Sequence, residues 1–118
     1  MKKENFFYLI IILTILIARL SVIIFPNKSL YINGIHIHHL WYGVILILVA
    51  VFLKNYKEVK FYCHAIGIGL ITDELVFIVV LGGEINLYFN TISILGMIIL
   101  LLIIYQFRKK IIKFLGLT

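Results

Sequence analysis

The sequence predicts an all-α fold, a four-transmembrane-helix bundle in a single integral membrane domain that covers residues 1–118. Of the 118 residues, 64% are hydrophobic, and the mean hydropathy is +1.16. Soluble globular chains are closer to half apolar, so a soluble fold of this size could not bury so much apolar surface. Four separate runs also approach the roughly 20 apolar residues that a helix needs to cross a bilayer.

The four apolar runs are expected to form helices over residues 6–25, 38–53, 61–81 and 91–107. The first ends at Pro26, because proline has no N–H and disfavours helix in the residue before it. This run is too long for a signal-peptide core and no small-residue cleavage site follows it, so we expect a retained helix. The second run is short and must stand upright or begin within the preceding loop. Gly82-Gly83 ends the third.

Basic residues predict the direction of the helices. They precede the first helix, fill the connection between the second and third, and follow the fourth: Lys2, Lys3, Lys54, Lys57, Lys60, Arg108, Lys109, Lys110 and Lys113. The positive-inside rule then places both termini and the middle connection in the cytoplasm of a multi-pass plasma membrane protein (N-in, C-in). The net charge of +6 therefore predicts contact with the anionic head groups of the lipid bilayer, and no nucleic-acid partner is expected. The stretch 109–117 is expected to lie on the inner leaflet as a short basic amphipathic tail.

The first outer connection contains a hairpin pattern. Asn33-Gly34 favours a two-residue turn, and the residues on both sides alternate in polarity. A short hairpin is one interpretation, and an irregular loop is the other, because an isolated hairpin is only marginally stable in water.

Ionisable side chains interrupt the apolar pattern at one depth. The six are Arg19, His36, His38, His39, Asp73 and Glu74. Counted at about 1.5 Å per residue from the nearest basic boundary, Asp73 lies roughly 20 Å, His39 roughly 22 Å and Arg19 roughly 24 Å along its helix. A charge at mid-helix costs about 2.5–3.5 kcal/mol on insertion, so a convergent cluster inside the bundle is expected.

Small residues predict close helix contacts beside this layer. Gly69 and Asp73 share one face of the third helix at four-residue spacing, and Gly67 and Glu74 share a neighbouring face. Small residues allow a partner helix to approach closely, which would hold the two acids against the first or second helix. Gly43, four residues after His39, gives the second helix a matching notch.

Imidazole and carboxylate groups together suit a transition metal, so the sequence predicts a site for zinc, iron or manganese. The predicted ligands are His36, His38, His39, Asp73 and Glu74, with Arg19 and Ser93 in a supporting or substrate-binding role. Successive residues of a helix differ by about 100° in direction, so Asp73 and Glu74 point different ways. Either both side chains bend toward one metal ion, or each carboxylate binds a separate ion.

Plainer interpretations remain open for the same residues. The histidines could be interfacial residues, Arg19 could form a structural ion pair with Asp73 or Glu74, or it could snorkel to the surface. The aromatic side chains are expected in the belts at the two membrane surfaces, as Tyr31, Trp41, Tyr42, Tyr62 and Tyr88.

Two segments, 34–43 (GIHIHHLWYG) and 67–74 (GIGLITDE), resemble a group of uncharacterised small prokaryotic integral membrane proteins. These pair a helix start of two histidines and a following glycine with a glycine-rich helix that carries Asp-Glu; in this chain the two patterns read His-His-x-x-x-Gly and Gly-x-Gly-Leu-x-x-Asp-Glu. The likeness covers the second and third predicted helices, roughly a third of the chain. The resemblance implies a role for His38, His39, Asp73 and Glu74 and names no reaction.

Three functions fit the sequence. The first is a membrane metal site that could activate water against a lipid-like substrate. The second is a proton or cation transport component, expected to form a homo-oligomer because four helices are few for a transporter. The third is a non-catalytic assembly or effector protein. The chain lacks a His-Glu-x-x-His motif and a nucleophile elbow, so whether it is an enzyme is left open.

Overall fold

The computed structural model describes residues 1–25, 30–32 and 35–118, with side chains over 1–25, 37–84 and 86–118. Its elements, in chain order, are α1 (Lys3–Ile24), β1 (Leu30–Ile32), β2 (Ile35–Ile37), α2 (His39–Val51), α3 (Lys57–Leu81), the 3-10 turn η1 (Ile85–Leu87) and α4 (Thr91–Phe114). The prediction of a helical protein with four α-helices is confirmed within this part of the chain.

Three of these helices, α1, α3 and α4, are long and apolar enough to cross a membrane. The second predicted span is shorter: α2 has 13 residues, starting at His39 and ending at Val51. A helix of that length measures about 20 Å, against about 30 Å for a hydrocarbon core.

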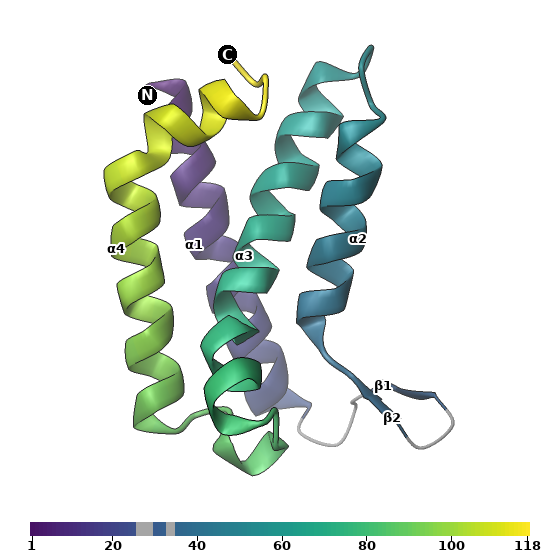
Figure 1. Cartoon of the computed structure of the whole chain (residues 1–118), viewed down its shortest axis with the longest axis vertical. Helices are drawn as coiled ribbons and strands as arrows, with labels where there is room; N and C mark the ends of the chain where they lie inside the picture. Colours follow the sequence, from purple (N-terminus) through teal and green to yellow (C-terminus); the bar gives the residue numbers. More distant parts are fainter. Residues whose placement is uncertain (26–29, 33–34) are drawn as a thin grey trace.

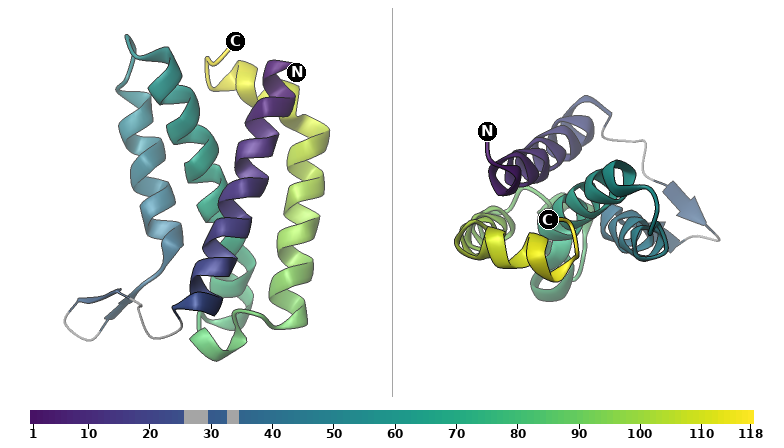
Figure 2. Two further views of the ribbon diagram at one scale, coloured as in Figure 1. Left: turned by 180° about the vertical axis from the view of Figure 1, so that it is seen from behind. Right: turned by 90° about the horizontal axis from the view of Figure 1, so that it is seen from above.

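The central helix is α3, which packs against α1, α2 and α4, while α1 and α4 also contact each other. Figures 1 and 2 show α2 on one side of α3, with α1 and α4 on the other. The N-terminus, the C-terminus and the α2–α3 connection all lie at one end of the molecule (Figure 1). We call this end, which gathers the basic residues named above, the lysine-rich end.

Glycines bring α3 against its neighbours. A Cβ at Gly43 of α2 would lie 2.6 Å from the Gly67 carbonyl oxygen, and one at Gly67 would lie 2.8 Å from the Gly43 oxygen. On the adjoining face of α3, a Cβ at Gly69 would lie 2.8 Å from Cβ of Thr14 in α1. The two helix contacts thus use the two faces of α3 that the spacing of small residues predicts.

The apolar core lies toward the lysine-rich end. Its buried residues are Phe7, Ile11, Ile15, Phe61, Ala65, Ile112 and Leu117. Two of them, Ile112 and Leu117, come from the stretch 109–117. The predicted helix end at residue 107 is wrong, because α4 continues to Phe114 and its last turns bend over the bundle (Figures 1 and 2). The location of this stretch on the inner leaflet stays a prediction.

The connection between α1 and α2 contains the short hairpin. Strands β1 and β2 pair antiparallel, with Leu30 opposite Ile37 and Ile32 opposite Ile35. The predicted turn at Asn33-Gly34 lies outside the described residues. The pairing favours the hairpin interpretation over the irregular loop, and a single residue, His38, separates the end of β2 from the start of α2 (Figure 1).

The α2–α3 contact predicts a sharp response to glycine substitution. We expect Gly43→Ala and Gly67→Ala each to lower the free energy of unfolding in detergent by about 1–3 kcal/mol, because an added Cβ would overlap the backbone of the facing helix. Leu48→Ala, at an exposed position of α2, is the matched control and should change it by less. Equal stability of all three variants in denaturant titrations would contradict the close contact.

Candidate functional site

Two consecutive acids on α3 are buried and turn toward different neighbours. Asp73 is 1% exposed and Glu74 is 3% exposed. Asp73 lies on the Gly69 face, which meets α1, and Glu74 lies on the Gly67 face, which meets α2. The step of about 100° between successive helical residues therefore separates the two carboxylates into two sets of contacts.

The first set is an ion-pair network of Arg19, Asp73, Tyr88 and Ser93. Arg19 Nε lies 2.7 Å from Asp73 Oδ1, and Nη2 donates to the Asp73 carbonyl oxygen at 3.0 Å. The guanidinium also donates to the Tyr88 carbonyl oxygen and, at 3.3 Å, to Ser93 Oγ. Each guanidinium nitrogen has a partner, as a buried arginine requires. Arg19 is thus held inside the bundle and does not snorkel to the surface.

Tyr88 completes this network and was missed by the sequence analysis. Its interpretation as an interfacial aromatic is wrong, because the side chain is 3% exposed and its hydroxyl donates to Asp73 Oδ2. Its ring lies 3.9 Å from Arg19 Cζ, within cation–π range. Burial, followed by the nearby Asp73 carboxylate, raises the pKa of the Tyr88 hydroxyl and keeps it protonated as a donor. Nothing in the linear pattern separates this tyrosine from the exposed ones.

The second set, which we call the His–Glu cluster, consists of His38, His39 and Glu74. His38 Nδ1 lies 3.2 Å from Glu74 Oε2, and His39 Nδ1 lies 2.9 Å from Oε1. The backbone N–H of His39 donates to Oε1 at 2.8 Å, so Glu74 also caps the start of α2. The two imidazoles approach the two oxygens of one carboxylate from the end of the hairpin and the first turn of α2.

Glu74 needs a positive charge that the rest of the site does not provide. The Arg19 guanidinium is already paired with Asp73. Among the described side chains, the basic groups within ion-pair distance of Glu74 are the two imidazoles. A buried carboxylate must be paired or lose its charge, so Glu74 requires a proton shared with a histidine, or a bound cation.

Part of the His–Glu cluster, together with the neighbouring Asp73, is compact enough for a metal. One ligand atom from each of His39, Asp73 and Glu74 lies within 4.8 Å of the others, and His38 adjoins this group through Glu74. Nitrogen and oxygen ligands about 2.0–2.1 Å from a tetrahedral zinc are about 3.3 Å apart, close to the 2.9 and 3.2 Å measured here. His39 Nδ1 is buried without a hydrogen-bond partner although Oε1 is near. A cation between them would satisfy both atoms.

Not all predicted ligands are equivalent. Both oxygens of Asp73 are engaged, one by Arg19 and one by Tyr88, which favours Glu74 over Asp73 as the available carboxylate. The His36 backbone belongs to β2, but its side chain lies outside the described residues. Ser93 is 1% exposed and supports Arg19. The remaining histidine, His64, is not part of this site and lines a pocket elsewhere in the molecule.

Known proteins offer no guide to this site. No family model, no curated protein and no solved structure matches the chain.

The ion-pair network predicts an asymmetric response to mutation. Asp73→Asn alone should lower the free energy of unfolding by about 3 kcal/mol, because it leaves the Arg19 charge buried without its partner. The double variant Arg19→Met with Asp73→Leu removes both charges and should recover much of that loss. Thermal denaturation in detergent micelles measures both. If the double variant is the less stable of the two, a simple charge-pairing role for these residues is excluded.

Proposed function

We propose that this protein binds a divalent transition metal (zinc, iron or manganese) inside the membrane, through His38, His39 and Glu74. One observation carries the proposal: two imidazole nitrogens converge on the two oxygens of a single buried carboxylate, which has no lysine or arginine partner among the described side chains. A divalent ion supplies the missing charge and accepts the lone pair of His39 Nδ1.

The ligand set also suggests the chemistry. Two histidines with one carboxylate form the ligand set of zinc hydrolases and of non-haem iron enzymes, both of which keep open positions for water or substrate. A metal held in this way could activate water against a lipid-like substrate that enters from the bilayer. Asp73 and Arg19 then hold α3 in position next to the ligands.

The proposed setting is the outer half of the plasma membrane. The lysine-rich end, with both termini, would face the cytoplasm, since basic residues accumulate on that side. The hairpin and the turn before α4 would then face outside, and the α2 segment together with its flanking residues would complete a fourth crossing. Access to the metal would be from the outer surface, where His39 is one-third exposed through its side chain.

Metal content provides the direct test. Detergent-purified protein should carry about one transition metal ion per chain, and His38→Ala with His39→Ala, or Glu74→Gln, should reduce this at least ten-fold, because each change removes ligands. His64→Gln alters a histidine outside the cluster and should retain the metal. Elemental analysis measures the content. Protein that is metal-free and whose thermal stability ignores added zinc, iron and manganese would refute the proposal.

A proton relay is the second candidate, because the same observation supports it. The distances of 2.9 and 3.2 Å from Glu74 to the two imidazoles also suit proton sharing, and intramembrane acids beside histidines recur in proton pathways. A proton on one imidazole would then supply the charge that Glu74 requires. Transport by so small a bundle would call for a homo-oligomer.

Proton flux separates the two candidates. If the cluster is a relay, proteoliposomes should dissipate a pH gradient, and Glu74→Gln should slow the flux at least ten-fold, because the neutral amide cannot take up the proton. Glu84→Gln, in the exposed turn after α3, is the matched control and should conduct like the wild type. Flux that is indifferent to Glu74→Gln, measured with a pH-sensitive dye, would remove this candidate.

A purely structural role, as an assembly or effector component, is supported only in part. It accounts for the ion pair between Arg19 and Asp73, which ties α1 to α3. It also accounts for the Glu74 carboxylate as a cap on the start of α2, but it does not supply the positive charge that a buried carboxylate needs.

A further inference from the structure

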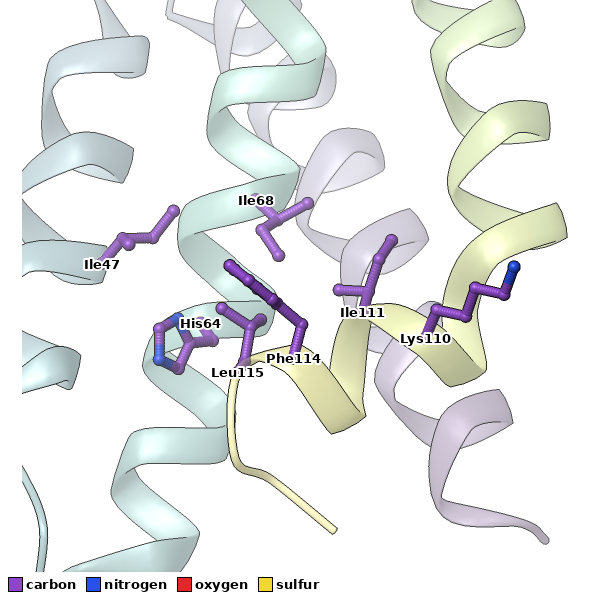
Figure 3. A pocket seen from close by; sticks show the side chains of 7 residues that line it. All are labelled: Ile47, His64, Ile68, Lys110, Ile111, Phe114 and Leu115. Carbon is purple, nitrogen blue, oxygen red and sulfur yellow. The ribbon is translucent and has the colours of Figure 1, made fainter.

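A pocket of about 430 Å³ lies near the lysine-rich end, far along α3 from the His–Glu cluster. Three helices line it, with side chains Ile47, His64, Ile68, Lys110, Ile111, Phe114 and Leu115 (Figure 3). The size falls within the range of sites for small molecules. Apart from His64 and Lys110 the lining is apolar, so the part of a ligand that fills it must be hydrocarbon.

His64 is the unexplained group in this pocket. It is 1% exposed, and its Nδ1 atom is buried with no hydrogen-bond partner among the described residues. Leaving such an atom unpaired costs free energy that an apolar residue of similar size would avoid. A hydrogen-bonding group on a pocket ligand would remove that cost.

The face of α3 that carries His64 is graded from charged to apolar. Lys60, His64 and Ile68 follow one another at four-residue spacing, so they stack on one side of the helix at steps of about 6 Å. The Lys60 ammonium is near the end of the chain, since a Cβ at Gly116 would lie 3.8 Å from its Nζ. From the lysine-rich end inward, a ligand would therefore meet a cation, a hydrogen-bonding imidazole and then apolar side chains.

We infer that this pocket binds one anionic phospholipid. Its phosphate would lie at Lys60 and at the exposed rim lysine Lys110, its ester group at His64, and an acyl chain between Ile47, Ile68 and Ile111. Basic pockets between transmembrane helices are known sites for anionic head groups, and the order of charge, polarity and hydrocarbon here matches the order within one lipid molecule. The site is independent of the proposed metal centre.

Native mass spectrometry of the full chain in detergent, with phosphatidylglycerol or phosphatidylcholine of identical acyl chains, tests the inference. The wild type should retain one phosphatidylglycerol at least ten-fold more tightly than phosphatidylcholine. Lys60→Gln should abolish most of this preference, and Lys54→Gln, which removes the same charge from the adjoining connection, should keep it. His64→Leu should weaken retention, with partial recovery in His64→Gln, whose amide can still hydrogen-bond.

Three results would overturn the inference. Equal retention of the two lipids would indicate ordinary lipid packing around a helix bundle. An equal loss in Lys54→Gln and Lys60→Gln would indicate a diffuse charge effect with no defined site. Retention of a second protein chain in place of the lipid would show that the pocket is a contact between copies. If His64→Leu does not fold, the comparison of Lys60 with Lys54 still decides the matter.

Discussion

Pairing of buried charge is the constraint on which the half of this structure away from the lysine-rich end depends. Asp73 and Glu74 are placed where neither water nor lipid can solvate them. Each must find its partner within the protein, and each does so on a different element, α1 in one case and the start of α2 in the other. The positions of α1, the hairpin and the first turn of α2 around α3 are therefore linked through two adjacent residues.

The two pairs differ in their completeness. The Arg19–Asp73 pair is closed: the guanidinium nitrogens and both carboxylate oxygens all have partners, and Tyr88 seals it from the following turn. The His–Glu cluster is open, because a carboxylate and two imidazoles balance only with a proton or an added cation. A structural role in holding α1 against α3 is enough to explain the Arg19–Asp73 pair. The open one has room for an exchangeable proton or cation, which is why the proposed function is placed there.

The lysine-rich end of the bundle is held together mainly by apolar contacts and contains one buried imidazole. The last turns of α4 bend over the core and place Ile112 and Leu117 among buried residues. This arrangement creates an apolar pocket with one imidazole beneath a basic rim. A histidine thus lies near each end of α3, His64 in the helix itself and His39 in the facing first turn of α2. Of these two, His39 faces a carboxylate.

Much of this could be predicted from the sequence, for identifiable reasons. The apolar composition required helices in lipid, and the four-residue spacing of Gly69 with Asp73 and the seven-residue spacing of Gly67 with Glu74 fixed which faces of α3 are in contact. Helical periodicity depends only on the spacing of residues within one segment, so the sequence alone is enough to predict it. The shared depth of Arg19, Asp73 and His39 followed in the same way from helical rise.

Only the tertiary structure decided which acid pairs with which base, because that depends on how α1 and α2 are placed around α3. It assigned Arg19 to Asp73 and the histidines to Glu74, where the sequence left the ion pair open to either acid. It also turned Tyr88 inward and folded the end of α4 onto the core. Composition and periodicity are properties of the chain itself, whereas partners are set by contacts between segments far apart along it.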